Sequence, residues 1–164
     1  MILPEMELFS WGVRLLYAWI INMFITGIFA FSGFAFHTQK LLPKSYYNIS
    51  NPKRLKKIYK AAGVPLFRTM LLATIWRSKS QQKKYFNGNR DGIYNLSEQS
   101  MKSEFGHLIP FILIMVLSIY LIAVVDLMLG MFTIVWNIVG NMYPIILQRH
   151  HRMRIEIIEK RFGR

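Results

Sequence analysis

The sequence predicts an all-α integral membrane protein with three transmembrane helices, and two observations support that class. Hydrophobic residues make up 53% of the 164 residues, yet the formal net charge is +13. The apolar residues gather in blocks at about 8–36, 104–125 and 127–148, and each block is near or above the roughly 20 residues that span a bilayer. The basic residues lie almost entirely outside these blocks. A soluble domain does not separate the two kinds of residue in this way.

The first block, 8–36, predicts a retained transmembrane helix. It is interrupted only by Arg14, Asn22 and small polar residues, and no basic residue precedes it. A cleaved signal peptide has a shorter apolar core and a basic start. The second and third blocks are separated by Asp126. One continuous helix over both would overshoot a bilayer, so we expect a tight hairpin with Asp126 and Gly130 near its tip.

Between the spans lies a basic loop, residues 37–103. A short helix is expected from Pro52, with Asn51 as its N-cap, and Gly63 ends it. Residues 64–76 are apolar but too short to cross, which favours an interfacial helix. The chain therefore reads as one membrane domain, 1–164, made of the first span (1–36), the loop (37–103), the hairpin (104–148) and a basic tail (149–164).

The basic residues orient the spans. Of the 21 Lys and Arg, 14 lie in 37–103 and 6 follow residue 147, while Asp126 marks the hairpin tip. The positive-inside rule then places the loop and the C-terminus in the cytoplasm and the N-terminus outside. These bases fit anionic lipid headgroups, a phosphate-bearing donor, or both. Nucleic-acid binding is not expected, since no recognition motif is present.

Several kinds of site are not expected from the residue types. The chain has no cysteine, which excludes a disulfide and a thiolate nucleophile. Its four histidines lack the spacing of a metal motif, so no metal site is predicted.

One face of the third block is polar. At about 100° per residue, four side chains fall within a stripe roughly 60° wide, and they are Asn137, Asn141, Gln148 and Arg152. Polar groups in hydrocarbon are costly, so the stripe is expected to face other helices or a wet pocket.

At the mouth of the second span, Glu104 and His107 are three residues apart and share a helix face. A carboxylate beside an imidazole can fix its tautomer for general-base catalysis, but the pair can equally be an interfacial contact. The hairpin would bring it next to the polar end of the third span.

The pattern Glu104-x-x-His107, followed by Asn141, Pro144, Gln148-Arg149, Arg152 and Arg154, resembles the glycosyl-4,4'-diaponeurosporenoate acyltransferase family of staphyloxanthin-type carotenoid biosynthesis. The resemblance covers mainly residues 104–155, and His150-His151 stand where the family pattern has Tyr-Asn. It implies a cell-membrane acyltransferase that moves a fatty acyl group from a cytoplasmic thioester to a hydroxyl of a glycosylated carotenoid or glycolipid.

The resemblance also suggests roles for single residues. His107 would be the base and Glu104 its orienting partner, and the amides of Asn137, Asn141 and Gln148 would form an oxyanion or polar pocket. The cations Arg149, Arg152 and Arg154 would bind the donor phosphates, or else anchor the helix end at the membrane surface. No cofactor is expected beyond acyl-CoA or a similar co-substrate thioester.

Two other classes fit the same residues. A non-catalytic membrane subunit or scaffold would use the polar stripe to join helices. Another membrane enzyme would bind a nucleotide cofactor through the arginines. The lipids of a deletion strain separate these possibilities, whereas the sequence is silent on the oligomeric state.

Overall fold

The computed structural model describes residues 10–74 and 90–161, and within these ranges the protein is all-α, as predicted. Of the described helices, three are long and apolar enough to cross a membrane, at Trp11–Gly33, Asn95–Val125 and Leu127–Ile157. The second and third are longer than the predicted spans, because each continues as a helix into polar sequence. Residues 8–9 of the first predicted span and 75–76 of the interfacial helix lie outside the described residues.

The first helix, α1 (Trp11–Ala35), exposes apolar side chains and buries polar ones, which is the opposite of a helix in a soluble protein. Phe24 and Phe31 are 68% and 74% exposed, whereas Asn22 is fully buried. The Asn22 amide donates to the carbonyl of Ala18 in α1 and to that of Thr133 across the helix interface, at 2.9 and 3.2 Å. Apolar surface outside and paired polar groups inside are what hydrocarbon surroundings require.

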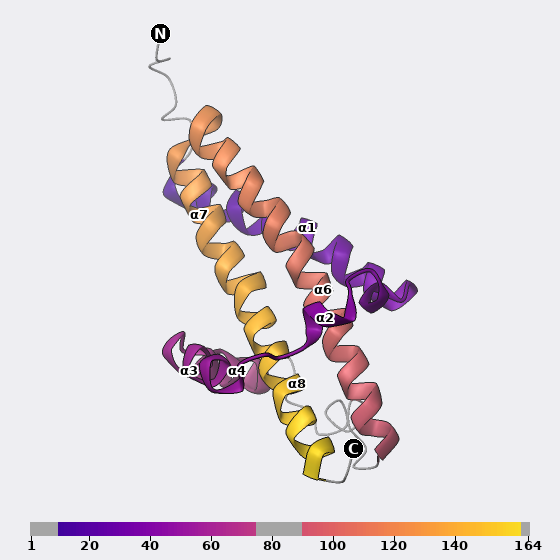
Figure 1. Ribbon diagram of the computed structural model, residues 1–164. Helices are drawn as coiled ribbons and strands as arrows, with labels where there is room; N and C mark the ends of the chain where they lie inside the picture. The colour runs from indigo at the N-terminus through magenta and orange to yellow at the C-terminus, as the bar shows by residue number, and fades with distance from the viewer. Residues whose placement is uncertain (1–9, 75–89, 162–164) are drawn as a thin grey trace.

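The predicted hairpin is present (Figure 1). Its first arm is α6 (Arg90–Tyr120), extended by a π-helical segment at Leu121–Val125. Its second arm consists of α7 (Leu127–Asn137), a π-helical segment at Ile138–Met142 and α8 (Tyr143–Arg161). Asp126 ends the first arm and caps α7 by accepting from the N–H of Leu129 at 2.8 Å.

Two contacts hold the tip of the hairpin. A methyl group at Gly130 would stand only 2.9 Å from the backbone nitrogen of Ile122 and the carbonyl oxygen of Ser118. The arms can therefore approach this closely only because residue 130 has no side chain. Asp126 also forms an ion pair with Arg14 of α1 at 2.9 Å, which gives a partner to the one cation in the first predicted span.

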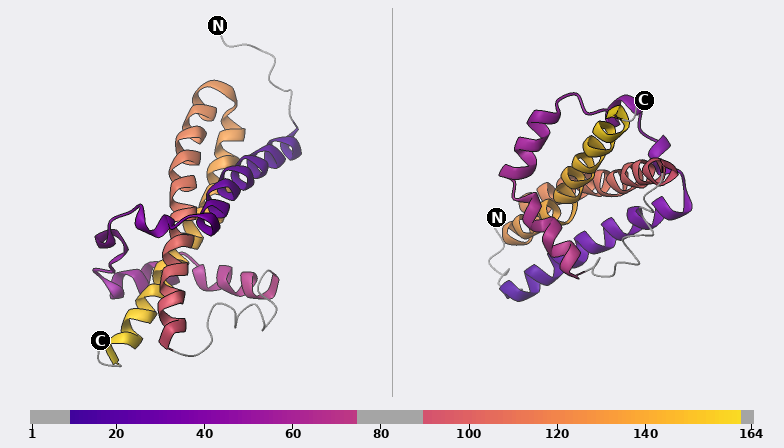
Figure 2. Two further views of the ribbon diagram at one scale, coloured as in Figure 1. Left: turned by 90° about the vertical axis from the view of Figure 1, so that its right-hand side faces the viewer. Right: turned by 90° about the horizontal axis from the view of Figure 1, so that it is seen from below.

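Up to residue 74, the described part of the loop after α1 contains four short helices. They are a 3-10 turn at Thr38–Lys40, α2 (Lys44–Tyr47), α3 (Pro52–Ala61) and α4 (Val64–Thr74). As predicted, Asn51 caps α3, accepting from the N–H of Arg54 at 2.9 Å. The turn to α4 uses Gly63 at φ 69°, a conformation that favours glycine. Both helices pack against α8, away from the hairpin tip (Figure 2).

Candidate active site

The polar stripe of the third span faces α6. Each of its four side chains contacts that helix: Asn137 reaches the Phe111 carbonyl, Asn141 reaches His107, Gln148 reaches Ser103 and Arg152 reaches Glu104. Asn137 and Asn141 are fully buried and Arg152 is 3% exposed. The stripe therefore faces protein rather than lipid, and it forms two neighbouring polar groups between α6 and the second arm of the hairpin.

The first group is a chain of hydrogen bonds whose direction is fixed. It begins at the carbonyl oxygen of Phe111, which can only accept, so the group that faces it at 2.9 Å is the amide nitrogen of Asn137. The carbonyl oxygen of Asn137 then accepts from the amide nitrogen of Asn141 at 3.0 Å. The remaining oxygen of Asn141 lies 3.0 Å from Nδ1 of His107.

This direction determines the tautomer of His107. Since Asn141 presents an oxygen, Nδ1 of the imidazole must carry the hydrogen and donate it. In the neutral ring, Nε2 then keeps its lone pair and can accept a proton.

A π-helical segment of the third span, Ile138–Met142, contains Asn141, the acceptor of His107. Pro144 has no N–H to offer the carbonyl of Gly140, four residues earlier. The helix is π-helical here, with the Tyr143 N–H bonded to the carbonyl of Ile138. The missing N–H of Pro144 thus accounts for the irregular hydrogen bonding of this turn, and π-helical turns are common at functional sites.

Thr26 of α1 completes this first group and was not predicted. Its hydroxyl lies 3.0 Å from the amide nitrogen of Asn141, so the polar group joins α1, α6 and the third span. A threonine in an apolar helix gives only a weak signal in the sequence. The position four residues after Asn22 on the same helix face is the one feature that could have indicated it.

The second group is an ion cluster around Glu104. This carboxylate is fully buried; one oxygen accepts from Nε of Arg149 at 2.8 Å and the other meets the guanidinium of Arg152. The predicted pairing of Glu104 with His107 is therefore wrong. Two permanent cations on the neighbouring helix stabilise a buried carboxylate more than a neutral imidazole on its own helix does.

Two tyrosines of α2 cover the ion cluster. The guanidinium carbons of Arg149 and Arg152 lie 4.8 and 5.2 Å from the ring centres of Tyr46 and Tyr47. Burial, together with the negative charge of Glu104, raises the pKa of both phenols to about 12. Both hydroxyls therefore stay protonated at neutral pH. Sequence reasoning missed these residues because α2 lies more than fifty residues from Glu104 along the chain.

The structure shows the contacts of the side chains that were predicted to form the polar pocket and to bind the donor. The amides of Asn137 and Asn141, predicted to form an oxyanion or polar pocket, are buried and donate to protein acceptors. Gln148 donates to the Ser103 hydroxyl at 3.1 Å. Arg149 and Arg152 are held by Glu104, and Arg152 is too deeply buried to reach a donor phosphate. Of the predicted donor-binding arginines, only Arg154 is exposed.

The fold and these contacts define a class of protein: a helical protein with three potential membrane spans and an oriented, half-buried histidine between them. Residues 43–161 match the family described as glycosyl-4,4'-diaponeurosporenoate acyltransferase. This chain belongs to that family, and the family description suggests an acyltransferase of carotenoid biosynthesis. No curated protein and no solved structure matches the chain.

Proposed function

We propose that the protein transfers a fatty acyl group from a cytoplasmic thioester, such as an acyl-CoA, to a hydroxyl of a glycosylated carotenoid or a similar amphiphile. Family membership supports acyl transfer in general. The single observation that supports a chemical role for this site is the hydrogen-bond chain from the Phe111 carbonyl to Nδ1 of His107. It makes Nε2 the basic atom of a histidine held between apolar helices.

The proposed step has three parts. Nε2 of His107 takes the proton of the acceptor hydroxyl while its oxygen attacks the thioester carbonyl. The tetrahedral intermediate then collapses, the carbon–sulfur bond breaks, and an ester forms. The leaving thiolate takes the proton back from the imidazolium, so that no oxidant or cofactor is consumed.

The bilayer orientation is part of the proposal. The hairpin tip at Asp126 lies at one end of the molecule, and α3, with its five Lys and Arg residues, lies toward the other (Figure 1). The positive-inside rule then places the basic end in the cytoplasm, against anionic headgroups, and the N-terminus outside. The cytoplasmic thioester would approach the basic end, and the lipid-like acceptor would approach from the bilayer.

Replacement of the base tests the proposal. In His107→Gln the side-chain amide can still donate to Asn141, but no basic nitrogen remains. We expect acyl transfer to fall by roughly 10²–10⁴-fold, while the thermal unfolding midpoint in detergent changes little. The purified protein is given an acyl-CoA and a glycosylated carotenoid, and mass spectrometry follows the formation of the product.

The matched control is His37→Gln, an exposed histidine outside the site. This variant should keep the wild-type rate. Wild-type turnover by the folded His107→Gln protein would eliminate His107 as the base.

A non-catalytic membrane subunit remains the second candidate function, and one observation favours it. Thr26, His107 and Asn141 join three helices through buried hydrogen bonds, which is a common use of polar side chains in membranes. In that case a deletion strain would lose an acylated lipid, whereas a strain carrying a stable His107→Gln protein would keep it.

A further inference from the structure

A second basic region lies on the opposite side of α8 from the Glu104 ion cluster, where α3 and α4 pack. Tyr59 of α3 stacks on the ring of His150, with ring centres 3.8 Å apart and planes 7° from parallel. Buried Tyr59 and Val64 also form an apolar core with Ile146 and Leu147 of α8. The basic side chains of α3 and α4 are thus held at a defined place beside α8 by packing.

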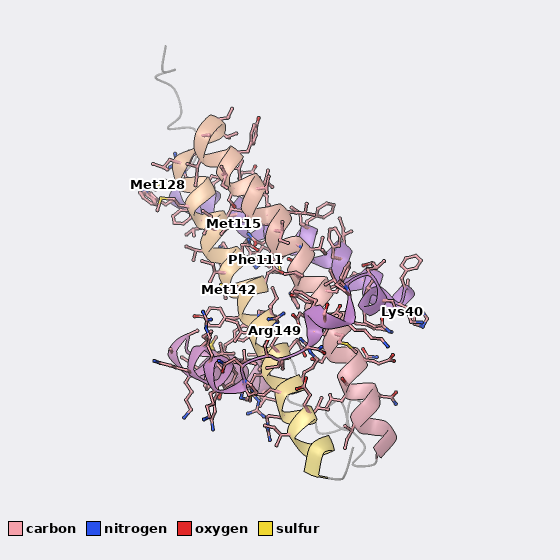
Figure 3. All side chains as sticks on the ribbon, in the orientation of Figure 1. Lys40, Phe111, Met115, Met128, Met142 and Arg149 are labelled. Atoms are coloured by element: carbon pink, nitrogen blue, oxygen red, sulfur yellow. The ribbon has the colours of Figure 1, made fainter. Side chains whose placement is uncertain are left out.

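Five side chains from three helices form what we call the basic cluster: Lys56 of α3, Arg68 of α4, and His150, His151 and Arg154 of α8. Lys56, Arg68 and Arg154 are exposed, and the positive charges of all three act on the His150 ring. Arg68 and Arg154 act on His151 as well. Nitrogen-tipped side chains gather around α3, α4 and the adjacent part of α8 (Figure 3).

Among the described side chains, no acidic group is paired with the cations of the basic cluster. In the described part of the chain, no carboxylate forms an ion pair with Lys56, Arg68 or Arg154. On α8 the nearest following acid is Glu156, which the helical period of about 100° per residue turns toward the side of Arg149 and Arg152. Like charges brought together by packing repel one another, and a bound anion reverses that cost.

We propose that the basic cluster binds the phosphate groups of the acyl donor, a diphosphate or phosphomonoester attached to the thioester. The identification of the ligand as a donor rests on the proposed function, whereas the assignment of a phosphate site rests on the cluster itself. Guanidinium groups suit such a ligand because their planar donors match phosphate oxygens. The site replaces the predicted donor contacts of Arg149 and Arg152 and adds Lys56, Arg68, His150 and His151 to Arg154.

Binding of free CoA to the full-length protein tests the site without any acyl transfer. The protein is placed in nanodiscs of phosphatidylcholine, which carries no net charge. In Arg68→Gln/Arg154→Gln we expect CoA to bind at least roughly tenfold more weakly, because two charge-assisted contacts are lost. The matched control is Arg54→Gln/Lys57→Gln, which removes the same charge from exposed positions of α3 and should change the affinity less than about twofold.

Folding is checked by circular dichroism, and Arg68→Lys/Arg154→Lys, which keeps the charge, should retain most of the affinity. Equal losses of CoA affinity in the cluster and control variants would overturn the proposal. They would show that CoA is attracted by the overall positive charge and not by the basic cluster. A second experiment uses native mass spectrometry to measure the phosphatidylglycerol that stays bound to the purified protein. If the wild type does not bind CoA but the cluster variant alone loses this lipid, the phosphate belongs to a headgroup and the donor assignment is wrong.

The two proposals fail separately. His107→Gln should bind CoA like the wild type, because His107 is not part of the basic cluster. A wild-type protein that binds CoA through the cluster, yet transfers no acyl group to any acceptor tested, would keep the phosphate site and remove the proposed function.

Discussion

The two sides of α8 use similar residues in opposite ways. Arg149 and Arg152 point toward α6, where a buried carboxylate and two tyrosine rings surround them. His150, His151 and Arg154 point toward α3 and α4, where the neighbouring charged groups, Lys56 and Arg68, are positive. In the sequence these residues form one uniform basic run. The difference shows that the partner on the next helix, rather than the residue type, decides whether a cation is structural or available to a ligand.

The largest expected effect is on the paired side. Glu104→Gln leaves two guanidinium groups without their counter-ion, one of them nearly fully buried. We expect the free energy of unfolding to fall by about 3 kcal/mol, at the low end of the range for broken buried pairs, because the Arg149 side chain is 34% exposed. Unfolding in mixed micelles measures it.

A second variant sharpens this result. Glu104→Leu/Arg152→Leu should be less destabilised than the sum of its single changes, because the carboxylate and its deepest cation leave together. If the changes simply add, the two residues are not coupled and the ion cluster is not the structural unit described here.

An intermediate effect is expected at alkaline pH, again on the paired side. Burial and Glu104 raise the pKa of Tyr46 and Tyr47 from 10.0 to about 12 in the folded protein. Their contribution to stability is complete below pH 10 and is lost as the pH rises toward 12, because the unfolded chain releases these protons first. Unfolding at pH 9, 10, 11 and 12 should show this decline.

Tyr46→Phe/Tyr47→Phe serves as the control, since it keeps both rings and removes both hydroxyls. Its stability should fall less steeply over the same pH interval, with lysine titration common to both proteins. Identical slopes would show that the two phenols are not responsible.

The smallest effect is expected at the basic cluster, where a substitution should raise the free energy of unfolding rather than lower it. Arg154→Gln relieves repulsion among the cations of the basic cluster, so the protein should become slightly more stable, by up to about 0.5 kcal/mol. The measurement is the unfolding free energy at low salt, repeated at high salt, where screening should abolish the gain. A loss of stability would mean that Arg154 has a structural partner and that the two sides of α8 do not differ.

The spans and the hairpin could be predicted because they depend on local runs of apolar residues. Asp126 was expected at the tip and is there, and the cap at Asn51 follows from the Asn-Pro pair. The role of Gly130 in close packing was not predictable, because a glycine near a turn is equally consistent with a loop.

The sequence predicted which helix ends meet at the candidate site, but it did not predict which side chains pair there. His107 and Asn141 were expected to be close together, since the hairpin fixes which ends of the helices meet. The partner of Glu104 was misassigned because spacing along one helix ignores competition from the next helix. Tyr46, Tyr47 and Thr26 come from distant segments, and their contacts depend on how α1 and α2 fold back.

The ion pair between Arg14 and Asp126 also has a consequence for biosynthesis. The two residues are 112 positions apart, so α1 leaves the ribosome long before its counter-charge is made. During that interval the nascent helix carries the Arg14 guanidinium without the Asp126 carboxylate, and a charge in an apolar helix favours the membrane surface near water. Translation past Asp126 supplies this carboxylate. A chain arrested before that point lacks this contact. The first helix therefore gains its ion pair with the hairpin tip only when synthesis has reached the start of the third span.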